Sequence, residues 1–264
     1  MKPDAVAGAA AFQRAMPLIQ QNLVRLNVTD VYPQSTGTAH AGGFCQCDNG
    51  MDYAFKAARP DSPFVPATEW LCSHLSIACR IQTPPMDALY TSDGQVWFGS
   101  RIEGGKLDED QCLLELQAGD MAARIVNLRE RLSMIYALDL FINNTDRHGK
   151  NYLFRTSLDR TVMMAFDFSF AWLAHGPALR GYPVEGCNTR QAHLFFARMY
   201  GFDQASAHDV LDLIQALPDD WIDVPVNSMP NEWKQGVDIG AATDWWKSDE
   251  RPARCAEIKE AIMQ

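Results

Sequence analysis

The sequence predicts an α+β fold of two lobes, a small strand-rich N-terminal lobe and a larger, mainly helical C-terminal lobe. In the first hundred residues, short apolar strands alternate with glycine and proline breaks, whereas later segments carry apolar side chains at helical spacing. A chain of 264 residues, 47% of them hydrophobic, suffices for one large domain or for two lobes around a cleft. We place the boundary after residue 100, giving domains 1–100 and 101–264.

The charge of the chain excludes several classes of partner. With 23 Lys and Arg against 33 Asp and Glu, the net charge is −10, so direct nucleic-acid binding is not expected. Anionic membrane surfaces are disfavoured for the same reason, and no run approaches about 18 apolar residues. The seven cysteines contain no Cys-x-x-Cys pair, which favours structural thiols in a reducing cytoplasm.

The N-terminal lobe begins with apolar residues at helical spacing over 9–26, where Pro17 would kink or delay a helix. Residues 32–50 hold four glycines, which predicts a loop or hairpin. Residues 51–56 then read as a strand with Tyr53 and Phe55 on one face.

A helix is expected to begin near Thr68, because Leu71, Leu75 and Ala78 lie one turn apart. Residues 86–98 predict two short strands around the turn at 92–94, and residues 99–105 a flexible connector between the lobes.

The C-terminal lobe opens with an apolar helical stripe from Leu128 to Ile142, interrupted by Asp139. An unpaired carboxylate there would be costly, so we expect Asp139 to be a buried hydrogen-bond acceptor that fixes the following loop. Apolar runs at 152–154 and 162–166 predict a hairpin, and helices are expected at 189–200, 205–217 and 251–263. The tryptophans of the tail are interpreted as packing residues.

A polar segment between the long helix and the hairpin carries the strongest functional signal. It reads Asn144-Thr145-Asp146-Arg147-His148-Gly149-Lys150-Asn151. Phosphoryl transfer from ATP needs a carboxylate at the acceptor hydroxyl, and an amide and a second carboxylate that hold magnesium. Asn151 follows Asp146 by the five positions found in protein kinases, although chance also produces such a pair. Asp167 precedes Phe168 as in the Asp-Phe-Gly motif, with Ser169 in place of glycine.

We therefore expect Asp146 to be the catalytic base and Asn151 and Asp167 to be the Mg²⁺ ligands. A kinase also needs a lysine for the α- and β-phosphates and a glutamate that holds it, and Lys56 and Glu69 stand in the required order. Taken singly, Lys56 also fits a surface lysine on an edge strand, and Glu69 a first-turn carboxylate after a Thr68 cap.

The remaining site predictions concern nucleotide binding. Gly42 and Gly43, with Gly37, would let the backbone approach ATP phosphates, although the Gly-x-Gly-x-x-Gly pattern is absent. Backbone groups near Phe98 and Ser100 are expected to contact adenine. Two further groups complete the expectations: the supporting residues Arg147 and His148, and the weakly predicted autophosphorylation sites Ser35 and Thr36. The role of Lys150 stays open between phosphate contact and solvation.

The segment 141–151 resembles the catalytic loop of HipA-like kinases, the serine/threonine kinase toxins of bacterial toxin–antitoxin systems. Their Asn-x-Asp-x-His-x-Lys-Asn pattern is matched at Asn144, Asp146, His148, Lys150 and Asn151. Residues 165–169 are similar to the family's metal-binding segment, 68–71 to its Glu-bearing helix and 217–221 to a segment near its C-terminus. By this resemblance the chain looks like a minimal, stand-alone member.

The resemblance implies a cytoplasmic kinase that uses ATP and Mg²⁺ to phosphorylate a protein Ser or Thr. It also implies a possible inhibitory, antitoxin-like partner, but neither toxicity nor a substrate identity. Two alternatives stay open. One is a phosphoinositide or small-molecule kinase, because the Asp-Arg-His triplet also occurs in phosphoinositide kinases. The other is a pseudokinase that acts as a binding or regulatory module.

Overall fold

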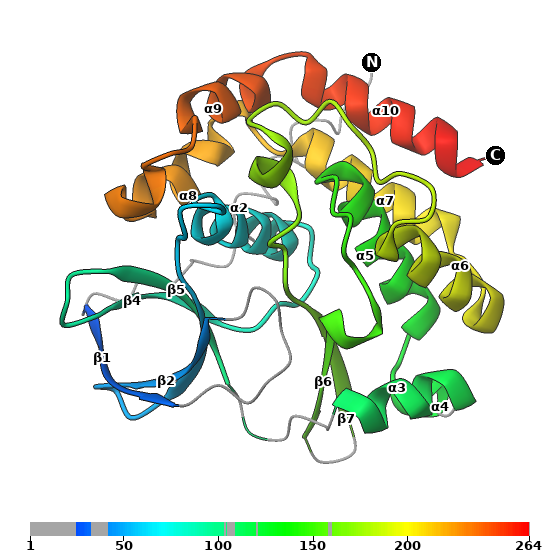
Figure 1. The fold of residues 1–264 in the computed structure, drawn as a ribbon. Helices are drawn as coiled ribbons and strands as arrows, with labels where there is room; N and C mark the ends of the chain where they lie inside the picture. Colours follow the sequence, from blue (N-terminus) through cyan, green and yellow to red (C-terminus); the bar gives the residue numbers. More distant parts are fainter. Residues whose placement is uncertain are drawn as a thin grey trace, which may run out of the picture.

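A computed structural model describes residues 25–32, 42–102, 104, 109–119, 121–157 and 160–263. The fold is α+β, as the sequence predicts. A closed barrel of five strands lies at one side of the molecule, and helices with one separate hairpin form the rest (Figure 1). The predicted domain boundary falls one residue before the end of the last barrel strand and stays a prediction.

The barrel strands follow the order β1-β2-β3-β5-β4, closed by a short parallel pairing of β1 with β4. Their bounds are β1 Leu26–Tyr32, β2 Gly43–Cys47, β3 Asp52–Lys56, β4 Met86–Tyr90 and β5 Val96–Arg101. Alternate side chains point inward, so Cys45, Tyr53, Phe55 and Leu89 form a small hydrophobic core of their own. The predicted strand at 51–56 and the strand pair at 86–98 are confirmed.

Two predictions for this part of the chain need correction. Leu26 belongs to strand β1 rather than to the end of a helix, and residues 9–24 of that prediction lie outside the described residues. Strand β1 was missed because, from Asn27 on, its side chains are half-buried or exposed and give no apolar pattern. The prediction of a loop or hairpin at 32–50 is confirmed from Gly43 on, where β2 pairs with β3 as a hairpin, and residues 33–41 lie outside the described residues. The expected connector at 99–105 is strand as far as Arg101, because β5 pairs with β3 and β4 up to its end.

Helix α2 (Val65–Ala78) begins three residues before the predicted start. Its N-cap is Phe64, and Pro66 fits the first turn because that turn has no backbone donor to lose. Thr68 is therefore not the cap, and Glu69 lies beyond the first turn. Nearly the whole helix is buried. The spacing of apolar residues along a single face therefore did not mark where the helix begins.

The C-terminal part contains the hairpin and the remaining helices. Their bounds are α3 Glu109–Ala118, α4 Met121–Arg124, α5 Leu128–Phe141, β6 Tyr152–Ser157, β7 Arg160–Ala165, α6 Asn188–Tyr200, α7 Gln204–Ala216, α8 Asp223–Ser228, α9 Ile239–Lys247 and α10 Glu250–Met263. Four short 3₁₀ turns accompany them: η1 Gly149–Asn151, η2 Trp172–His175, η3 Asp219–Ile222 and η4 Asn231–Lys234. The predicted long helix, hairpin and three later helices are confirmed within a few residues.

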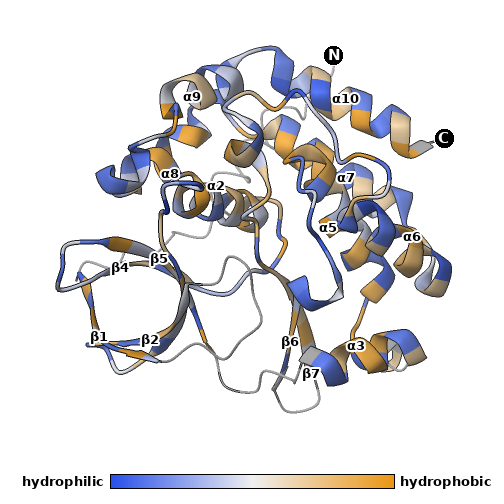
Figure 2. Cartoon of the chain, viewed as in Figure 1, coloured by the Kyte–Doolittle hydropathy of each residue, from blue (hydrophilic) through white to orange (hydrophobic). Residues whose placement is uncertain are grey.

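A second and larger hydrophobic core lies among these helices and includes α2. Helices α7 and α10 each carry both hydrophilic and hydrophobic residues, as expected for helices with one buried side (Figure 2). The tail tryptophans are buried packing residues, as predicted, and Trp233 Nε1 donates to Val96 O at 2.7 Å. That bond joins the C-terminal helices to the barrel strand β5.

None of the seven cysteines forms a disulfide, and six of them are buried. Their burial agrees with their interpretation as structural residues, and it raises the pKa of Cys45 and Cys255 to about 12. Within the described ranges, no helix has the length and apolar character to cross a membrane.

Candidate active site

The site begins with Lys56, at the end of β3 between β2 and β5. Its Nζ lies 2.6 Å from Glu69 Oε1, which comes from the buried helix α2. The same Nζ lies 2.6 Å from Asp167 Oδ1, although Asp167 is 111 residues away in sequence. Lys56 is therefore not a surface lysine on an edge strand. One ammonium group joins the barrel, α2 and the segment after β7.

The pKa values of this cluster reflect its burial and its charges. Burial alone would lower the pKa of Lys56, but the charges of Glu69 and Asp167 outweigh it and raise that pKa. Burial alone would raise the pKa of Asp167, but Lys56, and further away Arg147, hold it at about 2. At neutral pH the cluster is thus a lysine cation against an Asp167 anion.

Ser169, where the kinase motif has glycine, takes part in the same cluster. Its hydroxyl donates to Glu69 Oε1 at 2.9 Å and accepts from Lys56 Nζ at 2.8 Å. The Phe168 backbone N–H also donates to Glu69 Oε1, so Glu69 fixes the segment after Asp167 as well as the lysine. Asp167 itself has a φ of +61°, a left-handed conformation that is uncommon for a non-glycine residue.

Asp146 lies on the loop that joins α5 to the hairpin and is half-buried. Asn188 Nδ2, from the start of α6, donates to Asp146 Oδ1 at 2.5 Å. Asn151 Nδ2 donates to the backbone oxygen of Asp146 at 2.8 Å, which closes the loop on itself. The Asn151 amide nitrogen donates this hydrogen bond. The amide oxygen is the atom of the same side chain that can bind a cation.

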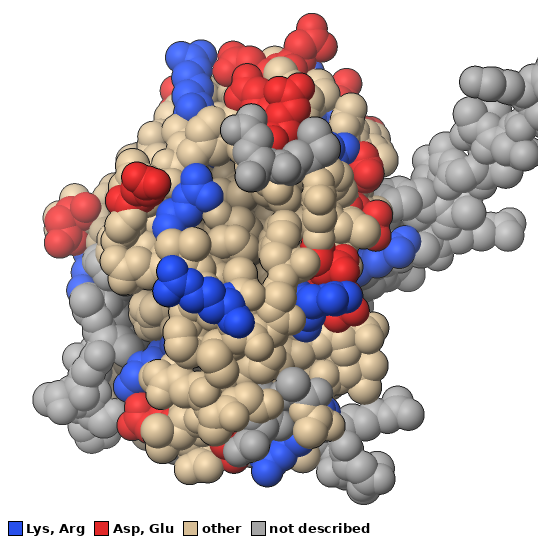
Figure 3. Space-filling view, turned by 90° about the vertical axis from the view of Figure 1, so that its right-hand side faces the viewer, with Lys and Arg blue, Asp and Glu red and all other residues tan. Residues whose placement is uncertain are grey.

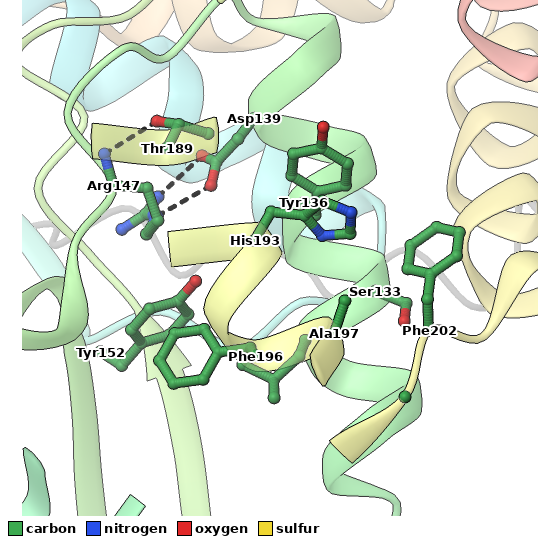
Figure 4. Close-up of a pocket in the computed structure, with 12 residues that line it drawn as sticks. Ser133, Tyr136, Asp139, Arg147, Tyr152, Thr189, His193, Phe196, Ala197 and Phe202 are labelled. Carbon is green, nitrogen blue, oxygen red and sulfur yellow. Dashed lines mark hydrogen bonds and ion pairs between the residues drawn. The ribbon is translucent and has the colours of Figure 1, made fainter. Parts of the chain in front are cut away.

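Buried hydrogen bonds of Arg147 and Asp139 hold this loop in place. Arg147 Nε and Nη2 donate to the two Asp139 oxygens at 2.9 and 3.0 Å, and both side chains are almost fully buried (Figure 4). Arg147 Nη1 donates to the backbone oxygens of Asn151 and Phe166. One guanidinium therefore joins the Asp146 loop to the residue before Asp167. The predicted roles of Asp139 and Arg147 agree with these contacts.

The other predicted residues lie as follows. His148 Nδ1 accepts from the Lys150 backbone N–H, which is a supporting contact. Lys150 Nζ forms an exposed ion pair with Asp110 Oδ1 of α3 at 2.8 Å. Gly43 is the first residue of β2 and Gly42 directly precedes it, whereas Gly37, Ser35 and Thr36 lie outside the described residues. A Cβ on Gly42 would lie 2.4 Å from the Phe55 ring, so packing explains this glycine.

Phe98 and Ser100 lie inside β5 and pair on both sides, with β3 and with β4. The backbones of both residues therefore belong to paired barrel strands. This corrects the expectation of a flexible connector from residue 99 on.

Sequence reasoning missed Asn188 and Thr189, at the start of α6. Thr189 Oγ1 accepts from the Arg147 backbone N–H at 2.9 Å and donates to Asn144 O at 2.7 Å (Figure 4). Both residues lie more than 40 positions after the loop that they contact. A polar pair at a helix start normally suggests capping, so no local signal pointed to the loop.

The donor set fits a magnesium ion. Asp167 offers a carboxylate and Asn151 an amide oxygen, and Mg²⁺ prefers one or two such ligands with substrate phosphates and water. In the part of the chain that the structure describes, no three His, Cys, Asp or Glu side chains gather as a metal site. A cation here would thus depend on the phosphates of a bound nucleotide for further ligands.

The barrel, the buried Glu-bearing helix and the loop–hairpin arrangement form a fold that is also found in a kinase and in a HipA protein of known structure. The chain is similar in structure to the proinflammatory kinase CtkA of Helicobacter pylori, with a TM-score of 0.58 and 13% identity. That match covers 91% of this chain and 98% of CtkA.

A second solved structure with this fold is HipA of Shewanella oneidensis, from a toxin–antitoxin complex with HipB and operator DNA. The TM-score is 0.54 with 13% identity, covering 92% of this chain and 75% of HipA. Neither a protein-family model nor a curated protein matches the sequence. At such identity the likeness is one of fold, and it confirms the expected resemblance at that level.

Proposed function

We propose that this chain is a two-lobed, Mg²⁺-dependent kinase of the cytoplasm that transfers the γ-phosphate of ATP to a protein Ser or Thr. One observation carries the proposal: Lys56 Nζ lies 2.6 Å from both Glu69 and Asp167. A lysine held by a glutamate beside the metal-binding aspartate is the arrangement that phosphoryl transfer requires in protein kinases. The fold of two kinase-like proteins supports the same assignment.

In this proposal Asp146 accepts the proton of the acceptor hydroxyl, and Asn188 holds one of its oxygens. Lys56 binds the α- and β-phosphates while Glu69 keeps its ammonium in position. Asn151 and Asp167 would hold Mg²⁺, which neutralises phosphate charge when bound. Gly42 and Gly43 would lie near the phosphates, and Phe98 and Ser100 on the strand that leads to the base.

The first test is intact-mass spectrometry after incubation with Mg-ATP and a dephosphorylated protein extract. We expect the wild type to transfer phosphate, to itself or to the extract, and Asp146→Asn and Asp167→Asn each to lose at least about 10³-fold in rate. The reason is that each amide keeps the shape of its carboxylate and removes the charge.

The matched control is Asp110→Asn, an exposed carboxylate on α3 near the same loop, which we expect to keep most activity. Circular dichroism must show all three variants folded. Wild-type transfer by Asp146→Asn would contradict the assignment. Nucleotide binding without transfer to protein would favour the pseudokinase alternative, and transfer to phosphoinositides alone the lipid-kinase alternative.

The HipA structure contains a partner protein, HipB. We extend the proposal to an inhibitory, antitoxin-like partner for this chain, whose addition would lower the transfer rate in the same assay.

A further inference from the structure

A groove of about 280 Å³ lies next to Asp146, between α3 and α6. The residues lining it come from three elements. They are Leu113 and Gln117 of α3, His148 and Gly149 of the loop, and Asn188, Gln191, Ala192, Phe195 and Phe196 of α6. Asn188 belongs to both places, because its Nδ2 donates to Asp146 Oδ1 at 2.5 Å. A ligand in the groove would therefore be separated from Asp146, the proposed catalytic base, by the side chain of Asn188.

At the groove, α3 packs directly on the loop that carries Gly149 and Lys150. A Cβ on Gly149 would lie 2.5 Å from Leu113 Cδ1, so the glycine lets α3 approach closely. Lys150 and Asp110 tie the same two elements together through their ion pair at 2.8 Å. Four of the groove's lining residues are apolar, Leu113, Ala192, Phe195 and Phe196, and Phe195 is 38% exposed, so part of its ring is accessible to an occupant.

The chemistry of the lining selects the occupant. Apart from His148 it contains no ionisable side chain, so it offers no Lys or Arg for a lipid phosphate and no carboxylate for a cationic side chain. Three amide side chains, Gln117, Asn188 and Gln191, carry donors and acceptors, as a peptide backbone does. The nitrogens of Asn188 and Gln191 each donate once within the protein, to Asp146 Oδ1 and Gly186 O, which leaves each amide a second N–H. The volume lies at the lower limit of small-molecule sites and suits one apolar side chain.

The surroundings agree with a polypeptide. Figure 3 views the molecule from the side of α6 and the C-terminal end of α10, where uncharged residues cover much of the surface between scattered charges. Leu114 of α3 and Met199 of α6 are also exposed apolar residues, at 60% and 43%. They add exposed apolar surface to the two helices that form the groove, and contiguous apolar surface is typical of protein-interaction sites.

We infer that this groove binds an apolar side chain of the acceptor polypeptide, close in sequence to the Ser or Thr that receives phosphate. The inference rests on the proposed function and adds to it a substrate class, an extended segment with Phe, Leu, Met or Ile beside the acceptor. Phe195 and Leu113 contact that side chain, and the amides bind its backbone.

The test uses the full chain with Mg-ATP and a library of peptides with a central Ser or Thr, in which each flanking position is fixed in turn. We expect the wild type to select large apolar residues at one flanking position. Phe195→Ala removes that selection and raises KM for the best peptide about tenfold, because a large contact is lost. We expect kcat and KM for ATP to stay unchanged.

The matched control is Leu194→Ala on the same helix, since Leu194 is exposed and lines a different cavity beside α10. It keeps the wild-type selection and KM. Peptide phosphorylation without an apolar preference, or with one that Phe195→Ala retains, overturns this inference and leaves the kinase assignment standing. Failure of the wild type to phosphorylate any peptide in the library counts against the proposed protein-kinase function itself.

Discussion

Arg147 makes more supporting contacts than any other side chain that we describe at the site. It binds both oxygens of Asp139 and the backbone oxygens of Asn151 and Phe166, and it lies over the Phe168 ring. A buried ion pair of this kind stabilises the fold only while both partners are present, because a single buried charge is strongly unfavourable. The pair thus fixes the loop geometry on which Asp146 depends.

We expect Asp139→Asn to lower the free energy of unfolding by about 3–5 kcal/mol, because the buried Arg147 charge loses its counter-charge. Urea unfolding at pH 7 measures the change. The control is Glu250→Gln, which removes an exposed ion pair with Arg180 and should cost under about 1 kcal/mol. Equal effects of the two variants would contradict the supporting role of the buried pair.

At the scale of elements, the start of β2 shows how a strand accommodates its neighbour. Gly42 N donates to Phe55 O at 2.9 Å, and the Phe55 ring stacks on Trp97 at 3.9 Å. There is no room for a side chain at Gly42, since a Cβ would lie 2.4 Å from the ring and 2.8 Å from the Phe55 backbone oxygen. The glycine is therefore needed for barrel packing whether or not a phosphate lies nearby.

Gly42→Ala should lower the free energy of unfolding by about 1–3 kcal/mol through overpacking. Thermal unfolding followed by circular dichroism gives the value. The matched control is Gly104→Ala, since a Cβ at Gly104 meets nothing within 4 Å. A Gly42→Ala variant as stable as that control would show that the barrel relaxes around the added methyl group.

At the scale of the whole molecule, α2 joins the large core and carries His74 into it. The His74 ring packs edge-on against Trp70, and neither ring nitrogen has a hydrogen-bond partner among the described residues. Burial lowers the pKa of His74 from 6.5 to about 4. The unfolded chain therefore binds a proton between these pH values that the folded chain does not, and stability falls as pH falls through that window.

We expect His74→Leu to weaken this acid sensitivity. Relative to the variant, the wild type should lose about 1.4 kcal/mol for each pH unit between 6.5 and 4. Urea unfolding at pH 7, 6, 5 and 4.5 measures both curves. The variant keeps every other titrating group, so the difference between the curves isolates His74. Parallel curves would mean that His74 is protonated in the folded protein.

The order of elements and most of the catalytic loop were predictable from sequence because their signals are local. The stripe of α5, the hairpin after it and the Asp146–Asn151 spacing each depend on residues a few positions apart. Strand β1 was not predictable, because from Asn27 on its side chains are half-buried or exposed without an apolar alternation, and its pairing partners lie 12 or more residues away. The start of α2 was misplaced because a helix buried on all sides has no polar face.

The sequence by itself determined which chemical groups are available: a lysine, three carboxylates, an amide and a loop in kinase order. Only the tertiary structure decided that Lys56 meets Glu69 and Asp167, that Ser169 joins them, and that Asn188 holds Asp146. The physical reason is that local patterns record helical or strand periodicity. Contacts between distant segments depend instead on how the barrel, α2 and α6 pack.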